Sequence, residues 1–251
     1  SATTIDGKTF AVTSYGDKAT PLYFSCRTDI LEKTGIDAGS VKTADDLEKL
    51  FAKVREVEPG IVPVAADNKK LLTAPYMIDA QGNFIKYDGL GDGDNCLVGI
   101  MDSDGTTIKN NYLRQEYLDT SLRFKKWYDN GWVYKDSANY GETGDQLIKA
   151  GTAFGYFKQL AMDSETNQKT ACGHEMTLIQ LEDDPMLNTG AFRKFTWAVP
   201  SISTEPEAAV KFLNLIYTDP EVLNLLMWGI EGTHYQTLAD GTIDFLEGQN
   251  P

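Results

Sequence analysis

The chain has few of the residues that most often bind metals. Its 251 residues include only two histidines, His174 and His234, and three widely spaced cysteines, Cys26, Cys96 and Cys172. Neither histidine lies in an HExxH pattern, and no CxxC or zinc-ligand spacing occurs. An odd number of distant cysteines indicates small buried apolar side chains rather than a disulfide scaffold. The sequence therefore predicts no metal site and no cofactor.

Motifs of the common enzyme classes are absent as well. The patterns GxSxG, GxGxxG and GxxxxGK[ST] do not occur. Two Asp-Gly stretches, at 92–94 and 102–105, resemble fragments of calcium loops, but position 12 counted from Asp102 is Leu113 instead of glutamate. Turn formation explains both stretches better. Nothing selects a glycosidase pair among the 37 acidic residues. We predict no catalytic residues and a protein that is not an enzyme.

Positive charge and long apolar runs are also scarce. The chain carries 37 acidic against 23 basic residues, a formal net charge of −14. This balance repels nucleic acid, favours solubility and argues against a polyanionic ligand. No apolar run approaches the roughly 20 residues that cross a bilayer. The chain begins at Ser1 without a Met, a basic region or an apolar stretch, so we expect a processed or excised piece whose start does not report targeting.

Strand-like and helix-like segments alternate along the chain, which predicts an α/β fold with a largely parallel sheet flanked by helices. The clearest helix begins at Thr43 as N-cap, with an acidic residue at N3, and carries an apolar stripe at helical spacing. That stripe is Leu47, Leu50, Phe51, Val54 and Val57. A short helix is expected at 30–33, ended by Gly35. Further helices are expected at 112–127 and 144–150, and two more after Ser203 or Thr204 and from Asp219-Pro220. Strands are expected at 8–14, 22–27, 61–65, 97–101, 152–157, 172–181 and 192–199.

Aromatic residues next to turns are the main candidates for a binding site. Aromatic rings stack on the apolar faces of sugars, and polar neighbours bind the hydroxyls. Core packing accounts for most of these rings. The set is Tyr76, Trp132, Tyr134, Tyr140, Tyr156, Trp197, Trp228 and Tyr235.

Short segments in a consistent order resemble the family 1 extracellular solute-binding proteins, the family of the maltose-binding protein. Residues 5–12 (IDGKTFAV) are similar to the family's DGK-x-Y strand, with Phe10 in place of tyrosine. Residues 229–235 (GIEGTHY) resemble a Gram-positive lipoprotein subgroup with a GIEGxHY motif. Further similar segments are 22–36, 43–47, 149–154, 201–213 and 217–222.

The resemblance implies two α/β lobes of the type II periplasmic-binding-protein kind, with ligand held between them. It also implies a segment of roughly a hundred residues before Ser1 that completes the first lobe. We therefore expect residues 1–195 to form mainly the second lobe. Residues 196–228 would return towards the first lobe, and 229–251 would cross back.

The function implied by the resemblance is extracytoplasmic capture of a small solute, a sugar or oligosaccharide, and its delivery to an ABC importer. Its partners would be the ligand and the permease subunits, with no nucleic acid. The protein would be a monomeric cell-surface lipoprotein. Two alternatives stay open: a glycan-active hydrolase on an α/β scaffold, and a binding protein for a peptide or another non-sugar solute.

Six residues are predicted to contact ligand. By resemblance, Tyr76 after Pro75 corresponds to a sugar-stacking tyrosine. Tyr156, Lys158 and Gln159 follow the strand at 152–157, where the family places ligand contacts.

Trp197 and Trp228 complete the set. Trp197 lies in the apparent return strand and Trp228 directly precedes Gly229, so both lie near the expected crossings between lobes. Residues there either pack the hinge or look into the cleft.

Overall fold

The computed structural model describes residues 3–14, 19–67, 70–72, 76–90, 99–101, 104–134, 139, 141–161, 164–193 and 196–246. The chain divides into two units. Unit 1 consists of Thr3–Ser14 and Phe195–Pro251, and unit 2 consists of Tyr15–Lys194. Unit 2 ends at Lys194, one residue before the limit expected for the second lobe. Residues 3–14 and the segment after 229 belong to unit 1. Cys96, Asp102, Tyr140 and residues 92–94 lie outside the described residues.

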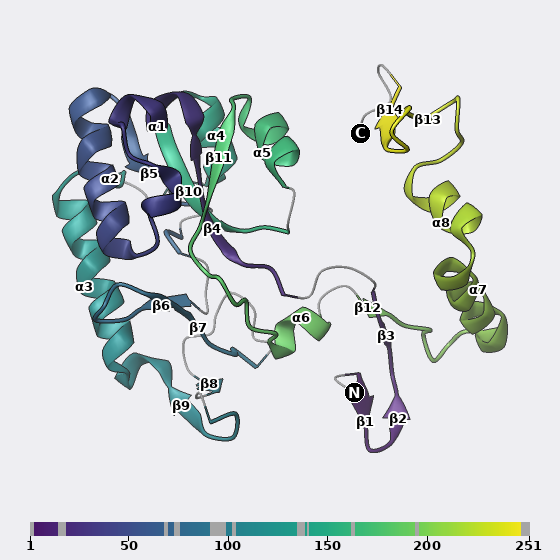
Figure 1. The fold of residues 1–251 in the computed structure, drawn as a ribbon. Helices are drawn as coiled ribbons and strands as arrows, with labels where there is room; N and C mark the ends of the chain where they lie inside the picture. Colours follow the sequence, from purple (N-terminus) through teal and green to yellow (C-terminus); the bar gives the residue numbers. More distant parts are fainter. Residues whose placement is uncertain are drawn as a thin grey trace. The chain divides into compact units, whose positions relative to one another are not determined.

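A four-stranded sheet forms the centre of unit 2 (Figure 1). Its strands, in spatial order, are β11 (Met176–Gln180), β4 (Leu22–Arg27), β10 (Ala153–Gln159) and β5 (Val62–Val64). Strand β10 is parallel to β5, whereas β4 is antiparallel to both β10 and β11. The sheet is thus mixed, which corrects the expectation of a largely parallel sheet. Alternation of helices and strands predicts the common direction of β5, β10 and β11, but not the insertion of an opposed strand between two of them.

Helices cover both faces of this sheet, so its strands are buried on both sides. On one face, α1 (Thr28–Thr34), α2 (Ala44–Val57) and α3 (Gln115–Asp129) lie near one another (Figure 1). On the other face, α4 (Gly144–Lys149) and α5 (Glu165–Cys172) contribute to a second apolar cluster. The strand expected at 172–181 begins at Met176, because Cys172 is the last residue of α5.

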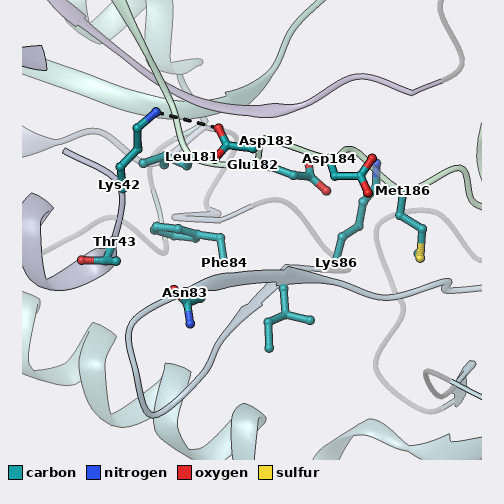
Figure 2. Close-up of a pocket in the computed structure, with 11 residues that line it drawn as sticks. Lys42, Thr43, Asn83, Phe84, Lys86, Leu181, Glu182, Asp183, Asp184 and Met186 are labelled. Atoms are coloured by element: carbon teal, nitrogen blue, oxygen red, sulfur yellow. Dashed lines mark ion pairs between the residues drawn. The ribbon is translucent and has the colours of Figure 1, made fainter. Parts of the chain in front are cut away.

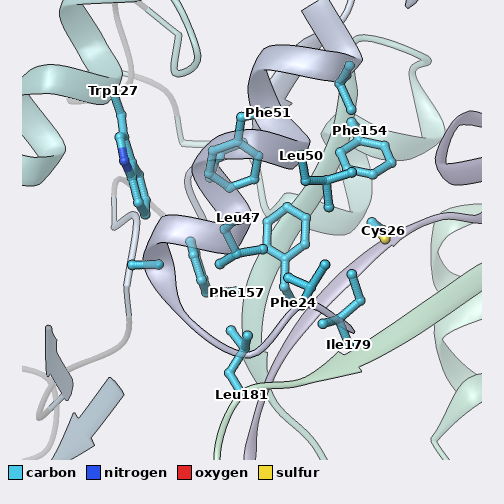
Figure 3. Packing of buried hydrophobic residues seen from close by; sticks show 14 of the residues in the cluster. Phe24, Cys26, Leu47, Leu50, Phe51, Trp127, Phe154, Phe157, Ile179 and Leu181 are labelled. Atoms are coloured by element: carbon cyan, nitrogen blue, oxygen red, sulfur yellow. The ribbon is translucent and has the colours of Figure 1, made fainter. Parts of the chain in front are cut away.

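The central aromatic cluster is built around Phe24 of β4 (Figure 3). Its ring centroid lies 5.1 Å from that of Phe157, 5.4 Å from Phe51 and 5.9 Å from Phe154. Trp127 stacks on Phe157 with an interplanar angle of 7°. Buried aromatic side chains each remove roughly 150–250 Å² from water, so this cluster dominates the stability of unit 2.

Helix α2 forms as its sequence predicts. The Thr43 hydroxyl accepts the Asp46 N–H at 3.2 Å, and the Asp46 carboxylate accepts the Thr43 N–H at 3.3 Å. This capping box satisfies donors that the first helical turn leaves free. The predicted stripe is buried at Leu47, Leu50, Phe51 and Val54. Helix α1 ends at Gly35, whose φ of 71° suits glycine, also as predicted.

Helix α3 buries a face that overlaps only in part with the one its sequence suggests, since Tyr117 and Phe124 pack against buried clusters. A stripe through Tyr117, Ser121, Phe124 and Tyr128 fits the apolar pattern, but Thr120 and Trp127 are the buried residues, and Ser121 and Tyr128 are exposed. The reason is the carboxylate of Glu48 on α2, which accepts the Trp127 indole N–H at 2.9 Å and is also paired with Arg123 and Lys126. A buried indole N–H needs an acceptor, and Glu48 provides it.

The remaining elements of unit 2 are short. Two hairpins are antiparallel pairs, β6–β7 and β8–β9. These strands are β6 (Tyr76–Ile78), β7 (Phe84–Lys86), β8 (Gly99–Met101) and β9 (Ile108–Asn110). The short helices are η1 (Ala38–Ser40), η3 (Asn111–Leu113) and α6 (Thr189–Arg193).

Two of the cysteines confirm the prediction made for them. Cys26 and Cys172 are free and buried. Burial raises the pKa of the Cys172 thiol to about 11, with the charge of Asp145 adding to the effect. Both therefore remain neutral thiols at ordinary pH.

Unit 1 is built from short strands and two helices. Its strands are β1 (Thr4–Ile5), β2 (Lys8–Thr9), β3 (Val12–Thr13), β12 (Thr196–Trp197), β13 (Tyr235–Thr237) and β14 (Ile243–Phe245). Its helices are α7 (Pro206–Thr218) and α8 (Pro220–Met227). Asp219 caps α8 and Pro220 occupies its first turn, as predicted. The N-cap of α7 is Glu205, so neither Ser203 nor Thr204 caps it.

The helices of unit 1 leave apolar side chains exposed. Helix α8 has no buried residue, and Leu225, Leu226 and Met227 are 57%, 56% and 64% exposed. The packed cores therefore lie in unit 2. No helix in the described ranges combines the length and apolarity that crossing a bilayer requires.

Gly155 of β10 offers a test of the central packing. A Cβ atom added there would lie 2.6 Å from Phe24 Cζ and 2.8 Å from Cys26 Cβ. We expect Gly155→Ala to lower the free energy of unfolding by about 1–3 kcal/mol, because an overpacked core must shift. Urea unfolding followed by tryptophan fluorescence measures the change. Gly60→Ala is the control, since nothing lies within 4 Å of a Cβ there; equal stability of the two variants would contradict the packing described.

Candidate functional site

The carboxyl ends of three strands mark one edge of the unit 2 sheet. Strands β5, β10 and β11 run in the same direction, and β4 begins at the edge where they end. The register pairs Gln159 with Leu22 and Gln180 with Tyr23. Open α/β sheets bind ligands outside the carboxyl ends of their strands. This edge is therefore the place to look for a site.

A polar groove of about 380 Å³ opens among segments that follow or flank this edge (Figure 2). Its volume lies within the usual range of small-molecule sites, roughly 300–1,000 Å³. Three segments form it: the start of α2, strand β7 and the residues after β11. The lining residues are Lys42, Thr43, Asn83, Phe84, Ile85, Lys86, Leu181, Glu182, Asp183, Asp184 and Met186.

Glu182 is the most firmly held carboxylate of the groove. It is only 9% exposed. Its Oε2 atom accepts the Tyr76 hydroxyl at 2.5 Å and the Leu22 backbone N–H at 3.1 Å. Its backbone oxygen accepts the Gln180 amide at 2.9 Å. A buried carboxylate is tolerated because it is hydrogen-bonded in this way.

Two of the predicted site residues meet behind this carboxylate. Tyr76 is 2% exposed and does not line the groove. Gln159 donates its side-chain amide to the Tyr76 hydroxyl at 3.3 Å and to the Thr20 carbonyl at 3.3 Å. Burial, together with the hydrogen bond to Glu182, raises the pKa of Tyr76 well above its ordinary value. Tyr76 is therefore a neutral hydrogen-bond donor.

Tyr156 and Lys158 lie elsewhere in unit 2. Tyr156 is fully buried in the second apolar cluster, and its hydroxyl donates to Gln168 at 2.7 Å. The same Gln168 oxygen accepts the Ser25 hydroxyl at 3.1 Å. Lys158 Nζ lies 3.3 Å from the Tyr156 hydroxyl and 5.3 Å from its ring centroid. Neither residue lines the groove at the carboxyl edge.

The two predicted tryptophans belong to unit 1. Trp197 is 47% exposed and lines an apolar groove of about 510 Å³ together with Phe10, Val12 and Tyr217. Trp228 packs against Phe245, with ring centroids 5.3 Å apart. The structure thus brings Tyr76 and Gln159 together at one site and distributes the other four residues elsewhere.

Sequence reasoning missed the charged residues of the groove. Glu182, Asp183 and Asp184 directly follow a predicted strand, which was the signal that could have found them. Lys86 lies on β7, and its Nζ is 5.6 Å from the Tyr76 ring centroid. Burial lowers the pKa of Lys86, while the charge of Glu182 partly opposes that shift.

The groove combines hydrogen-bonding groups with apolar surface. Carboxylates and Asn83 can accept from hydroxyls, Lys42 and Lys86 can donate, and the apolar members include Met186. This mixture suits a polyhydroxylated ligand. Within the described ranges, no group of three or more His, Cys, Asp or Glu side chains could hold a metal ion.

Comparisons with known proteins point to one class. No family model matches the chain. A carbohydrate ABC transporter substrate-binding protein from Streptococcus pneumoniae serotype 4 is 24% identical over 253 residues, covering 94% of this chain and 45% of that protein. The crystal structure of an N-glycan transport solute-binding protein from S. pneumoniae has a TM-score of 0.80 at 21% identity, covering 99% of this chain and 52% of the other.

A second structure of that protein, in complex with Man1GlcNAc, has a TM-score of 0.71 at 22% identity and covers 99% of this chain and 53% of the other. The fold is therefore the mixed α/β fold of solute-binding proteins. The chain spans about half the length of the curated relative it matches.

The Tyr156 hydroxyl provides a test of what that side chain does. We expect Tyr156→Phe to lower the free energy of unfolding by about 1 kcal/mol, because Gln168 loses a buried donor. Thermal or urea unfolding measures the loss, with the exposed Tyr128→Phe as control. A variant as stable as the wild type would contradict this structural role.

Proposed function

We propose that the chain is part of an extracytoplasmic protein that binds a carbohydrate and delivers it to an ABC importer. The observation that carries this proposal is the groove at the carboxyl edge of unit 2, where hydroxyl-binding groups and apolar side chains meet. The fold around it is shared with an N-glycan transport solute-binding protein. The curated relative is itself a carbohydrate ABC transporter substrate-binding protein.

Binding rather than catalysis is the role that this arrangement supports. The carboxylates of the groove differ greatly in setting: Glu182 is held by two hydrogen bonds, while the Asp183 side chain is 82% exposed and lies 3.8 Å from Lys42. A glycosidase needs two carboxylates on opposite sides of the scissile bond. Three adjacent residues of one segment do not provide that placement.

The wider setting is part of the same proposal. Unit 2 would be most of one lobe, and the two segments of unit 1 would belong to the other lobe and to the crossings. Permease subunits would be the protein partners, and a lipid anchor would hold the monomer at the cell surface. The exposed apolar side chains of α8 support a longer polypeptide that packs on unit 1.

Trp197 and Trp228 keep their proposed roles as ring-stacking residues in unit 1. The half-exposed indole of Trp197 supports this, because a buried ring could not meet a ligand. A change in tryptophan fluorescence on addition of ligand, reduced in Trp228→Phe, would support the assignment.

Calorimetric titration of the full-length protein tests the proposal. We expect a neutral oligosaccharide such as Man1GlcNAc to bind and a short peptide not to bind. Asn83→Ala should weaken sugar binding by about tenfold, because an amide that bonds hydroxyls is lost. Lys53→Ala, which alters only an exposed pair with Glu56, is the matched control. Peptide binding without sugar binding, or release of cleaved glycan, would contradict the proposal.

A further inference from the structure

The carboxylate of Glu182 is held from one side only. Both of its side-chain hydrogen bonds, from Tyr76 and from the Leu22 N–H, reach Oε2. Within the part of the chain that the structure describes, no hydrogen bond reaches Oε1. Because Glu182 lines the groove, Oε1 is an acceptor with unused capacity beside the space where a ligand would lie.

Among the described residues, no side-chain hydrogen bond holds the neighbouring Asp183 or Asp184 in this way. Asp183 forms an ion pair with Lys42, drawn as the dashed line in Figure 2. The two charged atoms are 3.8 Å apart, and both side chains are largely exposed. A flexible carboxylate must be ordered before it can bind, which reduces its contribution to affinity. Glu182 is already fixed, so its free oxygen can accept a hydroxyl without that cost.

The groove also contains a donor. Lys86 lines the same groove, and its Nζ lies over the Tyr76 ring, 5.6 Å from the centroid. The charges of Lys86 and Glu182 act on one another. A fixed acceptor beside a donor matches two neighbouring hydroxyls of a sugar, since each hydroxyl both donates and accepts. A ligand carboxylate in the same place would face Glu182 as a like charge.

We propose that Glu182 and Lys86 together bind a pair of neighbouring hydroxyls on a neutral sugar, and that Tyr76 is the positioning residue that fixes Glu182 from behind. The proposal rests on the proposed function and deepens it, because it makes the groove selective for neutral over uronic sugars. It also gives Tyr76 a role different from ring stacking. The buried ring of Tyr76 cannot contact a ligand. Its hydroxyl instead holds the Glu182 carboxylate, which lines the groove.

Calorimetric titration of the full-length protein with a neutral oligosaccharide, and with an alginate oligosaccharide of equal length, tests this inference. We expect Glu182→Gln to weaken neutral-sugar binding by about 10- to 100-fold, the usual range for a hydrogen bond to a charged group. The same substitution should reduce the ratio of the affinity for the neutral sugar to the affinity for the uronic sugar. Glu165→Gln, an exposed glutamate of α5, is the matched control. Circular dichroism checks folding, and Glu182→Asp replaces Glu182→Gln if that variant does not fold.

A double-mutant cycle tests the positioning role. Tyr76→Phe should weaken neutral-sugar binding about tenfold in the wild type but much less when Glu182 is already glutamine, because the two residues act through one contact. An equal loss in both backgrounds would overturn the role of Tyr76. Wild-type binding that Glu182→Gln leaves unchanged would overturn the role of Glu182, whereas a wild type that binds neither sugar would overturn the proposed function itself.

Discussion

Strand β4 carries hydrogen bonds along both of its edges, to β10 on one side and to β11 on the other. Its side chains reach both faces of the sheet: Phe24 enters the aromatic cluster beside α2, and Ser25 bonds to Gln168 of α5. Without β4, the two strands would have no common neighbour in the sheet. This one strand therefore connects the two larger apolar clusters, which lie on opposite faces of the sheet, and its first residue binds the Glu182 carboxylate of the groove.

The candidate site depends on where β4 starts. Leu22 is the first residue of β4, and its N–H donates to Glu182. On the next strand, Gln159 ends β10 and donates to Tyr76, which comes from the β6–β7 hairpin. Donors from two separate segments, β4 and β6, thus converge on one carboxylate, and a third segment, β10, supports one of them through Gln159. Such convergence is costly to assemble and is expected at a functional site more often than at an ordinary surface.

Local features of the fold could be predicted from the sequence because their causes are local. The capping box at Thr43, the left-handed Gly35 and the proline in the first turn of α8 each depend on residues a few positions apart. The direction of β4 could not be predicted, because it depends on how distant segments pair. The buried face of α3 could be predicted only in part: Tyr117 and Phe124 pack against buried clusters, but the indole N–H of the buried Trp127 donates to Glu48, which is far away in sequence.

The site residues also differ in whether local sequence or long-range contacts determine them. Tyr76 and Gln159 were predicted through resemblance, and the structure places them next to each other but not among the residues that line the groove. Glu182 was not found, although it follows a predicted strand. Its importance comes from the Leu22 N–H and the Tyr76 hydroxyl, which are 160 and 106 positions away. Sequence spacing carries no information about such partners.

The two ends of the unit 2 sheet region meet at a single point. The Leu181 N–H bonds to the Leu22 carbonyl at 2.9 Å, and the next residue bonds to the Leu22 N–H. The chain therefore enters and leaves this region at adjacent residues, as an inserted domain does. A mechanical force that pulled Pro21 and Asp183 apart would act first on these two hydrogen bonds and on the bond from the Leu160 N–H to the Pro21 carbonyl. Leu22 and Leu181 also belong to the buried cluster around Phe24, so separating the two connections would load the core of unit 2 directly.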